Sequence, residues 1–103
     1  MIKSIDLLNF FLKNNISFFS GVPDSVLKLF TEELESKKVQ NIITTNEGSA
    51  IGVSIGQYLK TKKLNVTYMQ NSGLGNAINP LISIADKNIY SIPLVLLIGW
   101  RGK

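Results

Sequence analysis

The chain changes from strand to helix within the stretch TTNEGSA, residues 44–50. The β-branched run at residues 41–45 predicts a strand, and Ile51, Ile55 and Leu59 form an apolar stripe that predicts a helix over residues 47–61. Glu47 therefore lies at a predicted strand-to-helix junction. In an open α/β sheet, such junctions border the crevice in which ligands bind. An acid in a helix's first turn also complements the helix dipole, so Glu47 has a structural as well as a functional interpretation.

The rest of the chain continues this alternation of helices and strands. Further strands are predicted at residues 16–20, 64–69 and 93–99, and helices at residues 4–14, 24–38 and 77–85, with Ser4 and Asp24 as N-caps. This order predicts an α/β fold with three αβα layers, in which a mostly parallel sheet carries helices on both faces. Pro80 is expected in the first turn of its helix. The almost wholly apolar strand at 93–99 is expected to be buried on both faces.

Parallel strands would bring four chemically distinctive junctions to one edge of the sheet. They are residues 21–24, 46–47, 70–76 and 100–101. Gly73-Leu74-Gly75 resembles a phosphate-binding loop but lacks the spacing of a P-loop or of the dinucleotide fingerprint, and a plain tight turn explains it better. Arg101 is either a solvated charge or a guanidinium that binds a phosphonate, sulfonate or carboxylate.

Composition restricts the chemistry that the chain can perform by itself. Its 103 residues correspond to a single domain, and 45% hydrophobic with 17% charged residues is typical of a globular protein. There is no Cys and no His, which excludes thiol and imidazole catalysis and most transition-metal ligand sets within the chain. The net charge of +4 comes from scattered lysines, which does not favour a nucleic-acid-binding face. The longest apolar run, residues 93–98, is too short to span a membrane, and we expect a cytoplasmic location.

Four segments together resemble a known family. They are FSGVPD at 19–24, TNEGSA at 45–50, QNSGLGNAINPL at 70–81 and LIGWRG at 97–102. In this order and spacing they resemble the N-terminal, pyrimidine-binding domain of thiamine-diphosphate-dependent decarboxylases. The likeness is greatest to the branch that acts on phosphonopyruvate or sulfopyruvate, and it covers nearly the whole chain.

The resemblance implies two catalytic residues. Glu47 matches the glutamate that bonds the ring nitrogen of the cofactor's aminopyrimidine and favours the imino tautomer, whose nitrogen takes the proton from the thiazolium carbon. Asp24 resembles an acid that these enzymes hold near the reacting carbon, a role compatible with that of a helix cap.

The resemblance also implies binding residues. Pro23 is expected to lie against the pyrimidine, with the other cofactor-binding positions being Glu47, Gly73, Leu74 and Asn76. Asn71 and Arg101 are the predicted substrate-binding residues, and Arg101 would bind the second anionic group of the substrate. No residue of this chain is predicted to bind metal.

A second polypeptide or domain is part of the same expectation. The family binds the diphosphate of thiamine diphosphate, with its Mg²⁺ ion, through a separate domain that carries a Gly-Asp-Gly motif, which this chain lacks. The family's pyrimidine-binding domain also continues beyond the Trp-Arg-Gly segment. Residues 1–103 are therefore expected to form an incomplete pyrimidine-binding domain, truncated at its C-terminal side, or an unusually short subunit, which is inactive alone and works in a homo- or hetero-oligomer. The branch with paired histidines is excluded because the chain has no His.

The expected reaction converts phosphonopyruvate to phosphonoacetaldehyde and carbon dioxide. One alternative is the α subunit of a sulfopyruvate decarboxylase. Another is a non-catalytic oligomerisation or regulatory module that uses Gly48, Gly52 and Gly56, which recur every four residues along the predicted helix, as an interface. A generic nucleotide-binding α/β domain is disfavoured by its glycine pattern.

Overall fold

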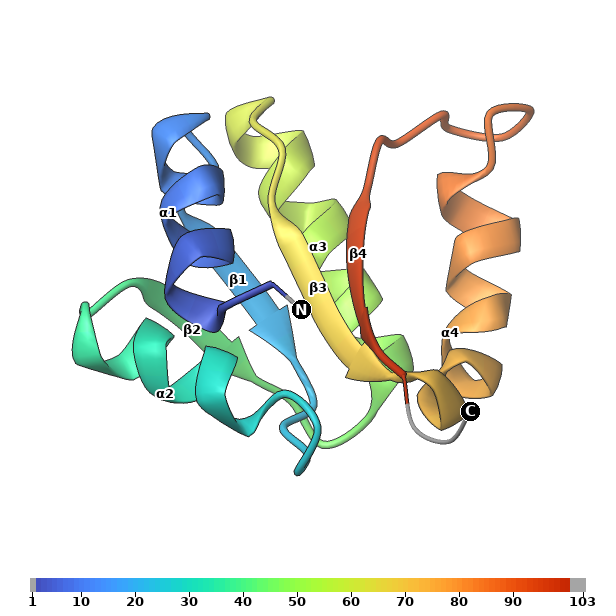
Figure 1. Ribbon diagram of the computed structural model, residues 1–103. Coiled ribbons are helices and arrows are strands. Elements are labelled where there is room, and N and C mark those ends of the chain that lie inside the picture. Colours follow the sequence, from blue (N-terminus) through green and yellow to red (C-terminus); the bar gives the residue numbers. More distant parts are fainter. Residues whose placement is uncertain (1, 101–103) are drawn as a thin grey trace.

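Four parallel strands form the sheet at the centre of the computed structural model, which describes residues 2–100 (Figure 1). They are β1 (Phe18–Gly21), β2 (Gln40–Ile43), β3 (Val66–Gln70) and β4 (Val95–Gly99), in the spatial order β2-β1-β3-β4. All three strand pairs are parallel, as expected for strands joined by helical crossovers. The predicted α/β fold with a parallel sheet is confirmed.

Helices cover both faces of this sheet. On one face, α1 (Ser4–Lys13) contacts α2 (Lys28–Ser36), and on the other, α3 (Glu47–Thr61) contacts α4 (Leu74–Pro80). Each layer encloses its own core, because alternate strand residues point to opposite faces. Phe19 and Tyr68 pack in the α1–α2 core, whereas Met69 packs in the α3–α4 core.

The connections determine where a ligand site can form. The chain leaves β1 toward the face covered by α2, and leaves the neighbouring strand β3 toward the face covered by α4. Two adjacent strands whose connections diverge in this way open a crevice at their carboxyl ends. The segments after β1 and β3, which contain residues 22–24 and 71–76, therefore border the crevice, as the sequence predicted.

Two predicted helix caps are wrong. Ser4 is the first residue of α1, and Lys3 occupies the cap position without a side-chain hydrogen bond. α2 begins at Lys28, four residues after Asp24. The Asp24 carboxylate instead accepts a hydrogen bond of 2.9 Å from the N–H of Leu27 and so closes the turn before the helix. Leu27, at the end of this turn, is buried against Gly99 of β4.

The fourth helix and the fourth strand also differ from expectation. A 3₁₀ turn, Asn71–Gly73, leads directly into α4, so Pro80 ends α4 instead of lying in its first turn. Because proline has no N–H, the regular ladder is interrupted there and the chain continues as a π-helical turn, Leu81–Ala85. β4 has only one strand neighbour, so Val95–Ile98 are half-buried and not enclosed on both faces.

Across residues 2–100, none of the helices combines the length and the apolar character needed to cross a membrane.

Candidate active site at the carboxyl edge of the sheet

Glu47 is held at the start of α3 by a well-formed cap. The side chain of Asn46 accepts a hydrogen bond of 2.8 Å from the N–H of Ser49, and Glu47 is the first helical residue, as predicted. Short side chains such as asparagine favour this position because they replace the hydrogen bonds that a helix start lacks. The junction between β2 and α3 is thereby fixed, and the half-buried side chain of Glu47 leaves it at the sheet edge.

The carboxylate of Glu47 reaches the segment that follows β3. Its Oε1 accepts a hydrogen bond of 2.9 Å from Nδ2 of Asn76 in the first turn of α4. Its other oxygen, Oε2, lies over Gly73, where an added Cβ would come within 2.5 Å of it. The predicted site residues Glu47, Gly73 and Asn76 are therefore in contact, although they come from the junctions after two different strands.

The starts of α3 and α4 also meet through their backbones. A Cβ on Gly48 would lie 2.9 Å from the carbonyl oxygen of Asn76, so only glycine allows this approach. By contrast, Gly52 and Gly56 are exposed, and Cβ atoms there would meet nothing within 4 Å in the part of the chain that the structure describes. Of these three glycines, Gly48 is therefore the one at which another segment of the domain approaches closely.

Pro23 and Asp24 lie at the end of the neighbouring strand β1. Pro23 is exposed, and Asp24 is half-buried. Oδ1 of Asp24 accepts the N–H of Leu27, but Oδ2 is buried and has no hydrogen-bond partner within residues 2–100. A buried carboxylate oxygen without a partner is costly and is common at sites that bind a ligand.

Tyr68 is a structural support that the sequence did not reveal. Its ring crosses the face of Gly21, where an added Cβ would lie 2.6 Å from ring carbons, and its hydroxyl donates a hydrogen bond of 2.8 Å to Oδ1 of Asn41 on β2. Burial raises the pKa of the Tyr68 hydroxyl above its usual value. Tyr68 thus connects three strands directly beneath the Pro23–Asp24 segment. An aromatic residue in a central strand is ordinarily read as core, so nothing in the sequence indicated this contact.

Two further predicted residues, Asn71 and Leu74, follow β3 at the same edge. Asn71 and Leu74 are both half-buried, in the 3₁₀ turn and at the start of α4 respectively. Arg101, the predicted ligand of the substrate's second anionic group, lies outside the described residues. Within residues 2–100, there is no group of three or more Asp, Glu, His or Cys side chains that could hold a metal ion.

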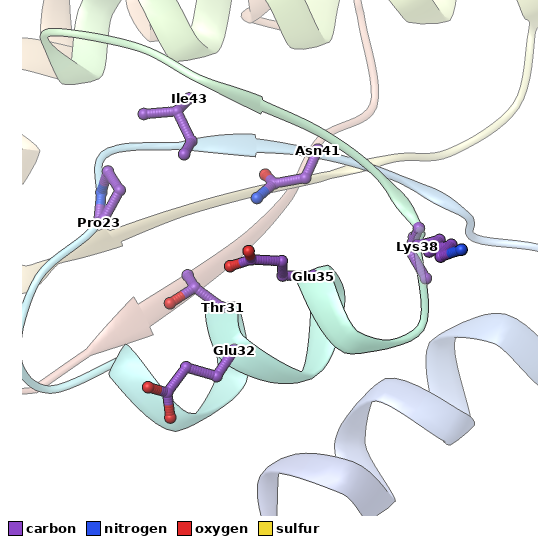
Figure 2. A pocket seen from close by; sticks show the side chains of 8 residues that line it. Pro23, Thr31, Glu32, Glu35, Lys38, Asn41 and Ile43 are labelled. Carbon is purple, nitrogen blue, oxygen red and sulfur yellow. The ribbon is translucent and has the colours of Figure 1, made fainter.

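A groove of about 510 Å³ lies between α2 and the edge strand β2, on the face opposite α3 (Figure 2). In this view Glu35 points from α2 toward Asn41 on β2. Pro23 is the only predicted site residue among the side chains that line it; the others are Thr31, Glu32, Glu35, Lys38, Val39, Asn41 and Ile43. Glu47 does not line this groove, so the groove is separate from the contact between Glu47, Gly73 and Asn76.

Comparison with protein families identifies the class of protein to which this chain belongs. The model of the thiamine pyrophosphate enzymes' N-terminal, thiamine pyrophosphate-binding domain matches residues 5–103, almost the whole chain. The chain belongs to this family. The family resemblance found in the sequence is thereby confirmed.

Individual relatives show which members of the family this chain is similar to. The chain is 38% identical over 100 residues to the α subunit of sulfopyruvate decarboxylase from Methanocaldococcus jannaschii, a match that covers 96% of this chain and 57% of the relative. The corresponding subunit from Methanococcus maripaludis is 39% identical over 92 residues, covering 88% of this chain and 53% of the relative. Phosphonopyruvate decarboxylase from Streptomyces hygroscopicus is 34% identical over 104 residues, covering the whole chain and 25% of that enzyme. The chain thus spans about half the length of the sulfopyruvate decarboxylase subunits.

A solved structure supports the fold. Benzoylformate decarboxylase from Polynucleobacter necessarius superposes with a TM-score of 0.81, covering all of this chain and 19% of that one, at 19% sequence identity. At this level of identity the likeness establishes the architecture alone.

Proposed function

We propose that this chain supplies the aminopyrimidine-binding part of a thiamine-diphosphate-dependent 2-keto acid decarboxylase. The observation that carries the proposal is the Glu47 carboxylate at the carboxyl edge of the sheet, held by Asn76 over Gly73. Family membership gives the cofactor class, and the relatives give the reaction class.

The residues present fit this cofactor. A carboxylate is the acceptor that a ring N–H of an aminopyrimidine requires, and Oε1 of Glu47 is already bonded to Asn76, which leaves Oε2 to meet the ring. Gly73 has no Cβ in the place that the Glu47 carboxylate takes, so the carboxylate can lie over it. The exposed ring of Pro23 offers an apolar surface for the same heterocycle, and Oδ2 of Asp24 is a second acceptor at the crevice. The chemistry supplied by bound thiamine diphosphate is a nucleophilic carbon that also accepts the electrons left by carbon dioxide.

Each residue then has a distinct part in the mechanism. Glu47 would accept a hydrogen bond from the cofactor's ring nitrogen and so favour the tautomer whose exocyclic nitrogen is the base. Asp24 would be the second acid of the site, because its buried Oδ2 has no hydrogen-bond partner within residues 2–100. Gly73 and Leu74 would line the middle of the cofactor, and Asn71 and Arg101 would bind the substrate.

The proposed substrate is a short 2-keto acid with a second anionic group. Phosphonopyruvate is the substrate that the sequence favours, and it agrees with the relative that the chain matches along its whole length. Sulfopyruvate is the second candidate, because the α subunits named for that substrate are 38–39% identical, compared with 34% for the phosphonopyruvate enzyme. Both substrates would present a compact anion to Arg101.

A partner that binds the diphosphate completes the proposed site. The likeness to α subunits of sulfopyruvate decarboxylase and the absence of a Gly-Asp-Gly motif from the sequence support a second domain or subunit that also binds Mg²⁺. The working unit is then an oligomer in which this chain covers the pyrimidine end of the cofactor.

Carbon dioxide release from the assembled enzyme tests the proposal. The chain, combined with its diphosphate-binding partner, thiamine diphosphate and Mg²⁺, is assayed with phosphonopyruvate, sulfopyruvate and pyruvate at equal concentrations. Turnover of one of the two dianionic substrates well above pyruvate, and only when the cofactor is present, supports the proposal and identifies the substrate. Equal turnover of all three substrates would refute the proposed specificity for a second anionic group. If no substrate were turned over in a cofactor-dependent way, the proposal that the assembly is a decarboxylase would be refuted.

A further inference from the structure

The side chain of Asn76 contacts Glu47, the residue proposed to bond the cofactor's ring. Its Nδ2 donates to Oε1 of Glu47 at 2.9 Å across 29 residues of sequence. We propose that Asn76 is a positioning residue, which acts on the cofactor only through the Glu47 carboxylate. The inference rests on the proposed function, and it differs from the family resemblance, which implied that Asn76 itself binds the cofactor.

Two separate contacts join Asn76 to the start of α3. The first is the side-chain hydrogen bond to Glu47, and the second is the approach of Gly48 to the carbonyl oxygen of Asn76, where a Cβ would come within 2.9 Å. Pro80 has no N–H to donate to that carbonyl in the regular helical pattern, so the α3 backbone can approach it closely. The backbone of Asn76 is therefore fixed relative to the residue that follows Glu47.

An asparagine suits this role better than a charged donor. Its amide restricts the rotation of the carboxylate without supplying a positive charge that would compete with the ring N–H for the same anion. With Oε1 bonded to Asn76, Oε2 is held over Gly73, which has no Cβ that would displace it. Loss of the amide would leave Glu47 in several rotamers, of which only one faces the ring.

A double-mutant cycle separates a positioning role from direct contact. Cofactor affinity of the assembled enzyme is measured by calorimetric titration with thiamine diphosphate for the wild type, Asn76→Ala, Glu47→Ala and the double variant. The proposal predicts a loss of about tenfold for Asn76→Ala, the usual effect of one hydrogen bond to a charged group. In the Glu47→Ala background the same change should reduce affinity by less than about twofold, because no carboxylate remains to be positioned.

Asn79→Ala is the matched control. Asn79 lies one turn further along α4, and its side chain bonds to Ser83 of the following π-helical turn. This variant should bind the cofactor like the wild type. Equal losses from Asn76→Ala in both backgrounds would mean that Asn76 touches the cofactor directly, and they would overturn the proposal.

A measurement on the 103-residue chain without cofactor keeps the proposal separate from the proposed function. The side-chain amide resonances of Asn76 should shift in Glu47→Ala, and those of Asn79 should not. Unchanged Asn76 resonances would overturn the proposal. If the wild-type assembly did not bind thiamine diphosphate, the proposed function would fail instead.

Discussion

Gly73→Ala should displace the Glu47 carboxylate without unfolding the domain. Gly73 has φ −81° and ψ −10°, which any residue adopts, so alanine brings no backbone strain. Its Cβ, however, would lie 2.5 Å from Oε2, 2.6 Å from Cγ and 2.7 Å from Cδ of Glu47. All three atoms belong to one half-exposed side chain, which can rotate away from the methyl group.

These distances give the expected size of the change in activity and of the change in stability. Ordinary van der Waals contact begins at 3.4 Å, so the carboxylate must move by about 1 Å, a displacement that costs about 100-fold in rate when it affects a catalytic group. Loss of the Asn76 hydrogen bond costs about 1 kcal/mol. Replacing glycine by alanine also lowers the conformational entropy of the unfolded chain, which stabilises the folded state by about 0.4–1 kcal/mol. The free energy of unfolding should therefore change by less than about 1 kcal/mol.

Two assays and one control test this reasoning. Urea unfolding of the chain gives its stability, and carbon dioxide release by the assembled enzyme gives kcat/KM. Gly75→Ala is the control, because a Cβ at Gly75 meets nothing within 4 Å in the described structure, and this variant should remain active. Full activity in Gly73→Ala with unchanged stability would refute the claim that the position of Glu47 matters. A loss of more than about 3 kcal/mol would show that the side chain cannot rotate away.

Three further substitutions test the account of the fold by urea unfolding of the chain. Gly52→Ala should raise the free energy of unfolding by about 0.5–1 kcal/mol, because this exposed position within α3 has space for a methyl group; a decrease would contradict the helix assignment. Thr67→Val should leave stability unchanged or raise it by up to about 1 kcal/mol, because the hydroxyl of Thr67 is buried without a partner among residues 2–100, and a clear loss would reveal a hydrogen bond there. Tyr68→Phe should lower stability by about 0.5–1.5 kcal/mol through the lost bond to Asn41. Since burial raises the pKa of Tyr68 in the folded state, wild-type stability should also fall as pH rises above about 10, where the unfolded chain releases this proton first, and Tyr68→Phe should lose that part of the decline.

The sequence predicted the layers of the fold because the relevant signals are local. The apolar stripe of α3 lies within a single segment, and periodicity identifies it. The edge position of β4 is different, since an apolar strand has the same sequence pattern at the edge and in the middle of a sheet. Asp24 is of a residue type common at helix caps, but its carboxylate closes a turn with Leu27, and the helix begins four residues later, at Lys28.

The site was predicted as a set of junctions but not as a set of contacts. Parallel strands bring their carboxyl ends to one edge, so Glu47 and the segment after β3 were expected to be neighbours. The hydrogen bond between Glu47 and Asn76 depends on how closely α3 and α4 approach, which is decided by Gly48 and by the position of Pro80 in the helix. Such contacts depend on packing between helices that are distant in the sequence, and no local pattern encodes them.

The most direct test of the central claim is the turnover number of the Glu47→Gln variant in the assembled enzyme. Glutamine retains an oxygen that accepts the Asn76 hydrogen bond, so the chain should fold with wild-type stability. The neutral amide cannot hold the ring proton of the cofactor, and kcat should fall by at least about 100-fold. Wild-type turnover in this variant would contradict the role of Glu47 and, with it, the proposed enzyme.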